Sequence, residues 1–402
     1  MPQLQKVRIE VKQMSNEMYI KNCVEQFEKL LNEQYARAEK MKNAPPAIDY
    51  ANLDKIIIGC CGGDGIGPII TAEARRVLEY LLKDAVDAGK VELRDIDGLT
   101  IENRIACDKA IPDDVLANIK ECHVLLKGPT TTPKGGTGAK ELESANVAMR
   151  RELDLFANVR PVAIPEEGVD WTFFRENTEG EYVLGSRGVE IPEYLCCDFK
   201  VTTDAGCERI ARMAFDFAVK NGKTNVAVVT KANIMKKTDG KFARIAREIA
   251  AAEYPSLTVE DWYIDIMTAK LVDTRGRSDF QVFLLPNLYG DIITDEAAQL
   301  QGGVGTAGSA NIGSRYAMFE AIHGSAPRMI ERGDGDYANP SSMLRAAELL
   351  LKHIGYTEEA SKLGKALDIC TGPDAAIKIT GRSDGASCKE FGDYVMNVCE
   401  NL

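Results

Sequence analysis

The chain has 402 residues, of which 45% are hydrophobic and 27% charged, and its formal net charge is -12. This length and composition are typical of a soluble globular protein with two domains. Nucleic acid and an anionic membrane surface would both repel so acidic a chain, so we expect neither as a partner. No apolar run approaches the ~20 residues of a membrane span, and the acidic N-terminal segment lacks the pattern of a signal or transit peptide, which favours the cytoplasm.

The 11 cysteines are scattered along the chain, with adjacent pairs at Cys60-Cys61 and Cys196-Cys197 and no C-x-x-C spacing. An odd number of scattered cysteines indicates neither a disulfide framework nor a zinc site. We therefore expect reduced thiols that fill core space.

Residues 1–43 predict a helical extension. One helix face carries apolar side chains among many charged residues: Val24, Phe27, Leu31 and Tyr35. The segment "APPAIDY" then ends the pattern, because proline lacks the amide donor and restricts its neighbour. The extension either docks on the body or serves subunit contacts. Since every motif described below lies beyond this linker, we expect the active site to be chemically intact without the extension.

The stretch "CGGDGIGPII", residues 61–70, follows the apolar run "KIIIG" and precedes a helical pattern. Glycines between a strand and a helix suggest a phosphate-binding turn, but their spacing is not the G-x-G-x-x-G of dinucleotide-binding folds. A plain turn that requires positive φ explains them equally well. The sequence leaves both interpretations open.

From Lys55 onward, short β-rich runs alternate with helical stretches. The expected strands are "KIIIG", "HVLLKGP", "NVAVVT" and "FQVFLLP", and the expected helices cover about 69–83, 204–220 and 239–252. Such alternation predicts an α/β architecture with helices packed on a sheet.

The segment that runs from "LLKGP" to "NVRPV" is rich in positive charge, although the chain as a whole is acidic. Few acids accompany its basic residues Lys127, Lys134, Lys140, Arg150 and Arg151. A helix that begins near Ser144 would bring this hydroxyl, the Asn146 amide and the Arg150 guanidinium to one carboxylate. Arg160 and Arg175 add two planar forks suited to further carboxylates. The alternative is a solvated charged surface.

Asp291 and Asp295 lie at i and i+4 in "LPNLYGDIITDEAAQLQGG", where a helix is expected to follow a strand. They therefore share one helix face, on which two carboxylates repel each other unless a cation lies between them. Hard divalent ions such as Mg²⁺ favour such oxygen ligands. The alternative is a helix N-terminus that carries favourable acids. Asp265 in "WYIDIMTAKLV" is either a third ligand or a buried structural aspartate.

Tyr182 in "FFRENTEGEYVLGS" and Lys231 in "VAVVTKANIMKKTDG" suit acid–base chemistry. Their ordinary pKa values are about 10 and 10.4, so each is a proton donor unless its site shifts it. A half-buried tyrosine and an ordinary surface lysine are the alternatives.

Seven motifs occur in one order: "GGDGIGP", "KGPTTTP", "SANVAMRRELDLFANVRPV", "FRENTEGEY", "KANIMKKTDG", "NLYGDIITDEAAQLQGGVG" and "FEAIHGSAP…ANP". Together they resemble the metal-dependent β-decarboxylating dehydrogenases, the family that includes isocitrate and 3-isopropylmalate dehydrogenases. The resemblance covers roughly residues 55–400. It implies an α/β fold of the isocitrate/isopropylmalate dehydrogenase type, with a helical extension at 1–50, a large discontinuous cofactor-binding domain at 51–155 and 302–402, and a smaller domain at 156–301 with a clasp at about 180–203.

The resemblance also implies roles for individual residues. Substrate would be bound by Ser144, Asn146, Arg150, Arg160 and Arg175, and the catalytic pair would be Tyr182 and Lys231. Mg²⁺ or Mn²⁺ would be held by Asp265, Asp291 and Asp295, with Lys231 and Asp265 supplied by the neighbouring subunit. The nicotinamide cofactor would be bound by Lys127, Thr132, Asn233, Glu320, His323, Gly324, Arg328 and Asn339. We therefore expect a homodimer, or a higher homo-oligomer, with shared active sites.

The same resemblance bears on substrate and cofactor choice. Isocitrate enzymes carry Ser-x-Asn before the first clamp arginine, whereas isopropylmalate enzymes carry apolar side chains. An apolar substituent would leave the Ser144 hydroxyl and the Asn146 amide unpaired, at a cost of about 1–3 kcal/mol each. Arg328 follows "HGSAP", where NAD-using members usually have Asp, and a guanidinium suits the 2′-phosphate of NADP. The segment "RMIERGDGDYANP" is longer than usual, and Met329 stands where bacterial NADP enzymes have tyrosine. NAD is therefore the alternative cofactor.

We therefore expect oxidative decarboxylation of isocitrate to 2-oxoglutarate and CO₂, a reaction of the tricarboxylic acid cycle, with hydride transfer to NADP or NAD. Homoisocitrate and 3-isopropylmalate are the alternative substrates. The alternative that is not an enzyme is a non-catalytic regulatory subunit. Such a subunit should have lost ligands or clamp residues, and all of them stand in this sequence.

Overall fold

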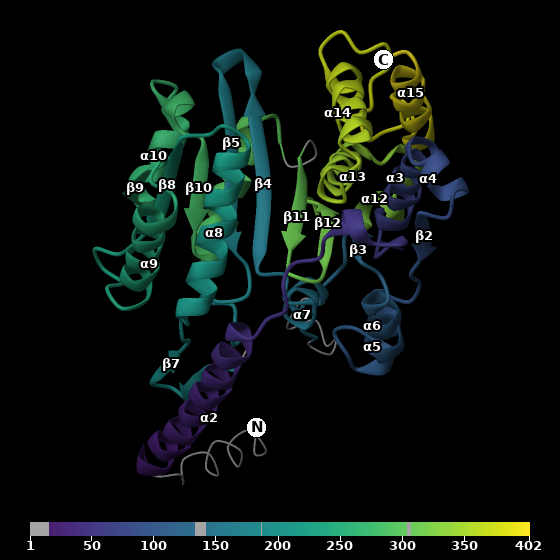
Figure 1. Ribbon diagram of the computed structural model, residues 1–402. Helices are drawn as coiled ribbons and strands as arrows, with labels where there is room; N and C mark the ends of the chain where they lie inside the picture. The colour runs from purple at the N-terminus through teal and green to yellow at the C-terminus, as the bar shows by residue number, and fades with distance from the viewer. Residues whose placement is uncertain (1–15, 133–141, 186, 304–306) are drawn as a thin grey trace.

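The computed structural model describes residues 16–132, 142–185, 187–303 and 307–402 (Figure 1). Its main sheet has the strand order β2-β1-β3-β12-β11-β4-β5-β10-β8-β9, and β6 pairs with β7 in a separate ribbon. The strands are β1 Ile56–Cys61, β2 Val91–Asp95, β3 Val124–Lys127, β4 Ala157–Ile164, β5 Val169–Glu176, β6 Val189–Ile191, β7 Leu195–Cys197, β8 Asn225–Thr230, β9 Thr258–Tyr263, β10 Val282–Leu285, β11 Gly308–Ile312 and β12 Ala317–Ala321.

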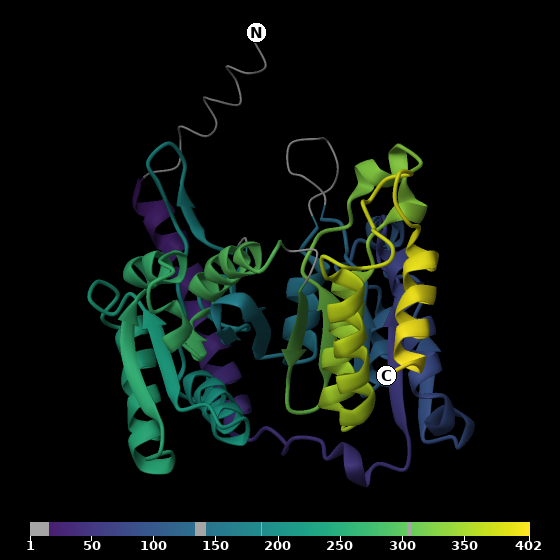
Figure 2. The same ribbon diagram turned by 90° about the horizontal axis from the view of Figure 1, so that it is seen from above.

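Helices cover both faces of this sheet, as Figures 1 and 2 show from two sides. The α-helices are α2 Asn16–Lys42, α3 Gly67–Leu81, α4 Lys83–Asp87, α5 Ile101–Cys107, α6 Asp113–Lys120, α7 Ala145–Glu152, α8 Asp204–Lys220, α9 Thr238–Glu253, α10 Ile264–Val272, α11 Asn287–Leu300, α12 Pro327–Glu331, α13 Ser341–His353, α14 Thr357–Thr371 and α15 Cys388–Glu400. Short 3-10 turns lie at Tyr50–Asn52, Pro165–Glu167, Arg277–Asp279 and Gly335–Tyr337. The predicted α/β fold class is confirmed.

Buried strands with helices on both sides must carry apolar residues on both faces, and β10 shows how this works. Val282 and Leu284 pack with α8 and α9, whereas Phe283 and Leu285 pack with α10 and α11 on the other face. The half of the sheet around β1 and β3 is covered in the same way, by α3, α13, α14 and α15 on one face and by α6 and α7 on the other.

The chain crosses between the two halves of the sheet at β4 and returns at β11, and these two strands pair antiparallel. Strand β12 then pairs parallel with β3, which brings the segment after residue 302 beside the segment before residue 155. The domain limits themselves stay a prediction. The β6–β7 ribbon falls inside the range expected for a clasp.

Within the predicted extension at 1–43, residues 16–42 form helix α2, which lies below α8 and beside β7 in Figure 1, whereas residues 1–15 lie outside the described residues. No helix among the described residues is long and apolar enough to span a membrane. The structure pairs none of the 11 cysteines in a disulfide, and most of them are buried, whereas Cys107, Cys196 and Cys197 are exposed.

Candidate active site

Two arginines project from neighbouring strands toward the same helix. In the antiparallel pair of β4 and β5, Arg175 lies opposite Asn158 and Arg160 lies opposite Phe173. Residues opposite each other point to one face, and so do residues two apart in a strand, so Arg160 and Arg175 share a face. Phe173 on this face packs with α11, and both arginines are at least nine-tenths buried. The side chains of Arg160 and Arg175, predicted to bind substrate, are therefore buried beneath α11.

Helix α11 supplies the carboxylates that meet these arginines. Arg175 Nη1 donates to Asp291 Oδ1 at 2.5 Å, and its Nε and Nη2 donate to the Asn287 side-chain oxygen at 2.9 and 2.6 Å. Arg160 Nη1 donates to Asp295 Oδ1 at 2.8 Å. The two aspartates share a helix as predicted, but each is paired with its own arginine. The sequence suggested that the two carboxylates repel each other without a cation. In the structure the two arginines offset this repulsion.

Tyr182 completes this cluster, because its hydroxyl donates to Asp291 Oδ2 at 2.8 Å. Burial, together with the hydrogen bond to Asp291 and the charge of that carboxylate, raises the pKa of Tyr182 to about 12. Burial alone would raise the pKa of Asp291, but Arg175, the Tyr182 hydroxyl and Arg160 outweigh it and hold that pKa below its usual range. At neutral pH the pair is thus a neutral phenol hydrogen-bonded to a carboxylate.

Lys231 and Asp265 form a second, separate pair. Lys231 follows the last residue of β8, where its backbone nitrogen donates to Asp239 Oδ2 at 2.7 Å. Its ammonium donates to Asp265 Oδ1 at 2.7 Å, and this hydrogen bond lowers the pKa of the exposed Asp265 carboxyl. Within the part of the chain that the structure describes, no group of three or more histidines, cysteines or acids gathers as a metal site. Asp265 therefore does not join Asp291 and Asp295 in one chain.

The predicted substrate residues of α7 lie at the start and along one turn of that helix. Ser144 is the N-cap as predicted, but its side chain does not cap the helix. The Asn146 side-chain oxygen accepts from Thr130 Oγ1 at 3.1 Å. Arg150 lies 3.6 Å from Glu320, and together with Arg160 it lowers the pKa of the buried Arg175 further than burial does alone, to about 10. The three arginines thus form one cluster, in which each guanidinium group lies beside a carboxylate.

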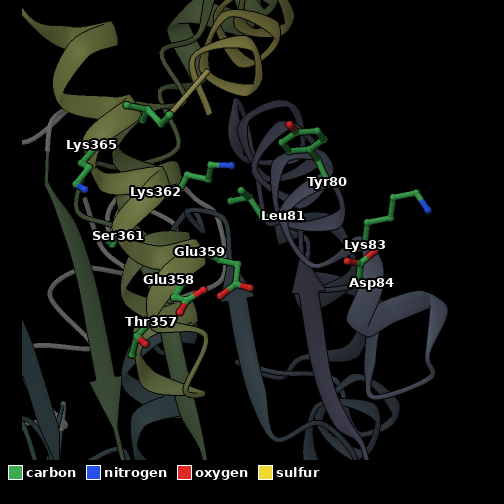
Figure 3. A pocket seen from close by; sticks show the side chains of 11 residues that line it. Tyr80, Leu81, Lys83, Asp84, Thr357, Glu358, Glu359, Ser361, Lys362 and Lys365 are labelled. Carbon is green, nitrogen blue, oxygen red and sulfur yellow. The ribbon is translucent and has the colours of Figure 1, made fainter. Parts of the chain in front are cut away.

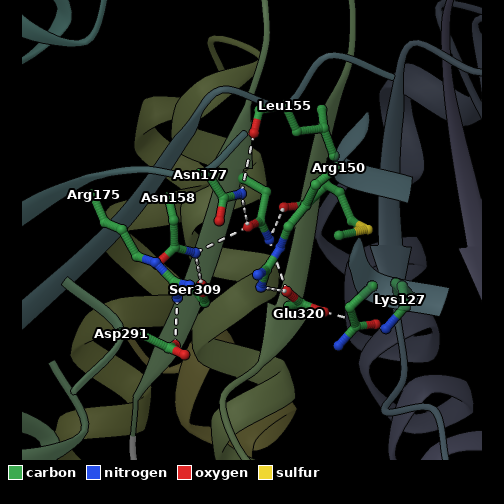
Figure 4. Close-up of polar contacts among 12 residues, drawn as sticks. Lys127, Arg150, Leu155, Asn158, Arg175, Asn177, Asp291, Ser309 and Glu320 are labelled. Atoms are coloured by element: carbon green, nitrogen blue, oxygen red, sulfur yellow. Dashed lines mark hydrogen bonds and ion pairs between the residues drawn. The ribbon is translucent and has the colours of Figure 1, made fainter. Parts of the chain in front are cut away.

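A buried polar network underlies Arg150, and sequence reasoning did not find most of it (Figure 4). Glu320 lies 3.2 Å from the Lys127 ammonium and accepts from Asn311 Nδ2 at 2.8 Å. Asn311 in turn accepts from Asn158 and Asn177, each at 3.0 Å. Asn158 and Asn311 lie in the central strands β4 and β11, which no local sequence pattern predicted. Lys127 and Glu320, predicted to bind cofactor, are brought together as a buried ion pair.

The glycine turn before α3 serves close backbone packing. Gly65 has φ 59°, and a side chain there would collide with the Ser325 carbonyl oxygen of the "HGSAP" segment. The Asp64 carboxylate accepts from the Thr131 and Ile101 backbone nitrogens, each at 2.7 Å. The Thr131 and Ser325 hydroxyls lie 2.7 Å apart. The turn therefore joins the "KGPTT" and "HGSAP" segments, which gives its glycines a structural role.

The remaining predicted cofactor residues divide between two places. In and after the "HGSAP" segment, Gly324 and Arg328 are exposed, His323 is half-buried, and the Asn339 side chain accepts from the Ser341 backbone nitrogen at 2.9 Å. The structure brings this segment beside the segment that contains Thr131 and the exposed Thr132. Asn233 instead follows β8, in the same segment as Lys231.

A separate surface hollow of 720 Å³ lies between α3 and α14 (Figure 3). It is lined by lysines and acids in comparable numbers, among them Lys83, Asp84, Glu358 and Lys362. None of the predicted site residues lines it, so it is not the site described above.

The chain matches the family described as isocitrate/isopropylmalate dehydrogenase over residues 57–395. The chain belongs to this family. A solved family structure, the isocitrate dehydrogenase from Methylococcus capsulatus, superposes with a TM-score of 0.73 at 32% identity, over 86% of this chain and 99% of that one.

Two relatives within the family illustrate how cofactor names vary. The NADP isocitrate dehydrogenase of Rickettsia felis is 40% identical over 313 residues, which are 76% of this chain and 61% of that protein. The mitochondrial NAD isocitrate dehydrogenase subunit 2 of Schizosaccharomyces pombe is 37% identical over 329 residues, 79% of this chain and 82% of that protein. This chain therefore spans about 61% of the length of the first curated relatives it matches.

Proposed function

We propose that the protein is an isocitrate dehydrogenase that converts isocitrate to 2-oxoglutarate and CO₂ and reduces NAD(P)⁺. The observation that carries this proposal is the arginine cluster of Arg150, Arg160 and Arg175 beside the Tyr182–Asp291 hydrogen bond. Three guanidinium groups in one place suit a substrate with several carboxylates, and planar forks bind carboxylates in two-point contacts. The names of the relatives support the same activity.

Ser144 and Asn146 would select isocitrate over an apolar analogue. Both are half-buried at the start of α7, one and two turns before the Arg150 guanidinium. A carboxylate can accept from the hydroxyl and the amide, whereas an isopropyl group would leave both unpaired at about 1–3 kcal/mol each. Homoisocitrate and 3-isopropylmalate remain the alternative substrates.

Asp291 and Asp295 fit a hard divalent cation such as Mg²⁺ or Mn²⁺. They are oxygen donors one turn apart on α11, and the lowered pKa of Asp291 keeps its carboxylate ionised. When bound, the cation would polarise the substrate hydroxyl and stabilise the negative charge left by loss of CO₂. The arginines that now pair with these aspartates would then turn to the substrate carboxylates.

Tyr182 and Lys231 would take part in the proton transfers of the reaction. A phenol with a pKa of about 12 keeps its proton at neutral pH, so Tyr182 can deliver it to the carbon that has lost CO₂. Lys231 would help the proton of the substrate hydroxyl to leave, because its ammonium group would stabilise the negative charge on the oxygen while the hydride passes to the nicotinamide. Asp291 holds the Tyr182 hydroxyl and thereby sets the direction of its proton.

The separation of Lys231 and Asp265 from the arginine cluster supports a homodimer with shared active sites. A second copy would bring its own Lys231–Asp265 pair to Asp291 and Asp295 and complete a set of three carboxylates. Helices α10 and α11 expose apolar side chains that suit such a contact, Ile266 at 49% and Ile292 at 60%. Whether larger assemblies form is a question for measurement of the molecular mass.

Arg328 supports NADP as the preferred cofactor, since the exposed guanidinium on α12 can pair with a 2′-phosphate. The relatives are named for NADP and for NAD, so each cofactor belongs in the assay. The cytoplasmic location stays a prediction that cell fractionation can test.

A substrate panel tests the proposed function. The purified protein is assayed with Mg²⁺ or Mn²⁺ against isocitrate, homoisocitrate and 3-isopropylmalate, each with NAD⁺ and NADP⁺. We expect isocitrate to give the highest kcat/KM. Equal turnover of isocitrate and 3-isopropylmalate would refute the role given to Ser144 and Asn146. No turnover of any substrate by a folded, metal-loaded protein would favour the regulatory subunit.

A further inference from the structure

Helix α2 is attached to the body by specific contacts. Gln26 Nε2 donates to the backbone oxygens of Arg187 and Gly188 at 3.1 and 2.7 Å. The rings of Phe27 and Phe199 lie 4.7 Å apart, and Leu30 is buried. The helix therefore holds a defined position next to the β6–β7 ribbon and to α8, which the sequence left undecided.

Beside this helix, two buried carboxylates organise the segment between the clamp residue Arg175 and the catalytic Tyr182. Glu176 and Glu179 are each 3% exposed. The Glu176 carboxylate accepts from the backbone nitrogens of Thr178 and Glu179 at 3.0 and 2.6 Å, so the chain folds back around it. The Glu179 carboxylate accepts from the backbone nitrogen of Thr203, the N-cap of α8, at 2.9 Å. The two acids thus fix the turn that leads to Tyr182.

A buried negative charge in this turn requires a positive partner, because an unpaired buried charge is strongly destabilising. Arg37 of α2 donates to Glu179 Oε1 at 3.1 Å and to Thr178 Oγ1 at 2.9 Å. Arg209 of α8 donates to the same threonine oxygen at 2.9 Å, but it is shared with the Asp154 carboxylate. Among the described residues, Arg37 is therefore the arginine that contacts the Glu179 carboxylate directly.

The turn is also joined to the substrate site by hydrogen bonds. The Glu179 carbonyl oxygen accepts from Asn287 Nδ2 at 2.9 Å, and the Asn287 side-chain oxygen accepts from Arg175. Three residues after Glu179, the Tyr182 hydroxyl meets Asp291. A continuous set of contacts therefore runs from α2 through the carboxylate pair to Tyr182.

We propose that Arg37 is a positioning residue of the active site, which pairs with the buried Glu179 carboxylate from the N-terminal helix and thereby fixes the turn that presents the Tyr182 hydroxyl to Asp291. This inference rests on the proposed function, because it assigns Tyr182 the role of proton donor. It replaces the expectation that the active site is intact without the extension.

The charge balance gives the inference a pH signature. Burial raises the pKa of the Glu176 carboxyl and the Glu179 charge raises it further, whereas Arg209, the Thr178 hydroxyl and Arg37 lower it. The buried Cys207 thiol also faces this pair. Removal of Arg37 should therefore let Glu176 take up a proton at higher pH, which weakens the bonds that fold the turn.

The test compares Arg37→Gln with Arg37→Lys and with Glu33→Gln on the same helix. Glu33→Gln removes an ion pair with Arg187 and leaves the carboxylate pair untouched. We expect Arg37→Gln to lower kcat for isocitrate roughly 10-fold at pH 7, part of the 10² to 10⁴ that a proton donor supplies. KM for isocitrate should stay within about twofold, since Arg175 keeps its own bonds to Asn287 and Asp291. The acid limb of the kcat profile should move to higher pH, and Arg37→Lys should recover most of the rate.

Hydrogen exchange separates failure of this inference from failure of the proposed function. In Arg37→Gln, amides of residues 177–182 should exchange faster, while those of β5 before Arg175 should not. This readout requires no turnover. Unchanged exchange at 177–182 would overturn the inference, and so would a kcat profile equal to that of the unmodified protein. A rate loss of equal size in Glu33→Gln would also overturn it, because general loosening of α2 would then explain the effect.

Discussion

Replacing Asp291 with Asn separates the role of this residue in stability from its role in metal binding. In the structure, Asp291 is the anionic partner of Arg175, which is 1% exposed at its side chain, and it accepts the Tyr182 hydroxyl. A hydrogen bond to a charged group contributes about 1.5–3 kcal/mol. Because the Asp291 side chain is 38% exposed, solvent screening reduces this to about 1–2 kcal/mol. The bonds of Arg175 to Asn287 remain in the variant.

We therefore expect Asp291→Asn to be slightly less stable than the unmodified protein in the presence of a chelator. With an unfolding entropy of about 2.1 cal/mol/K per residue, a chain of 402 residues loses about 1 °C of Tm per kcal/mol, so the shift is roughly 1–2 °C. The carboxylate repulsion that the sequence suggested would instead predict a metal-free variant that is unharmed or more stable.

The pH dependence follows from the lowered pKa of Asp291. A carboxyl whose folded-state pKa is depressed stabilises the protein above its unfolded-state value, and this contribution is lost as the pH falls through the folded-state value. The stability difference between the unmodified protein and Asp291→Asn should therefore be largest near neutral pH and should shrink under acid conditions.

The effect of Asp291→Asn on metal binding and rate should be much larger than its effect on stability. Loss of one carboxylate ligand should remove most of the Mn²⁺-induced rise in Tm and should lower the decarboxylation rate at least about 100-fold. The matched control is Asp295→Asn. The Asp295 side chain pairs with Arg160 and is 60% exposed, so its replacement should change the metal-free stability less. The metal-induced rise in Tm should be lost in both variants. An Asp291→Asn protein that keeps its metal-dependent shift in Tm and a near-normal rate would refute the site.

Four further changes test other parts of the site. Ser144→Leu should lower kcat/KM for isocitrate at least about 10-fold and affect any 3-isopropylmalate turnover far less, as steady-state rates on both substrates would show. Tyr182→Phe should lower kcat about 10²- to 10⁴-fold, and its folded state should be verified by near-UV circular dichroism. Lys127→Met should cost about 3–5 kcal/mol in chemical unfolding, because it leaves the buried Glu320 without its closest cation. Arg328→Asp should raise KM for NADP⁺ relative to NAD⁺ at least about 10-fold; an unchanged ratio would show that Arg328 does not contact the cofactor.

Local sequence signals predicted the elements that depend on local chemistry. Helix α8 begins and ends at the predicted residues, because its apolar residues recur with helical spacing and Thr203 caps its N-terminus by accepting from the Gly206 nitrogen. Strand β8 likewise coincides with the predicted apolar run. The order of the motifs predicted the family correctly.

The antiparallel strands at the centre of the sheet were not predicted, because they lack an apolar pattern. Strand β4 carries Arg160 and Pro161, and β11 is made of small and polar residues that bond across the sheet, as Asn158 does with Ser309. Such strands are stabilised by partners far apart in sequence. The pairing of Arg175 with Asp291 depends in the same way on the register of β5 against α11, which no local pattern contains.

The central claim is that this protein oxidises and decarboxylates isocitrate with a divalent cation. The most direct measurement is the initial rate of nicotinamide reduction by the purified protein with isocitrate, with Mn²⁺ or with a chelator, alongside quantification of released CO₂. We predict that reduced cofactor and CO₂ form in equal amounts, only with the cation, and faster from isocitrate than from 3-isopropylmalate. Absence of cofactor reduction with either NAD⁺ or NADP⁺, in a protein shown to be folded and to bind Mn²⁺, would contradict the claim.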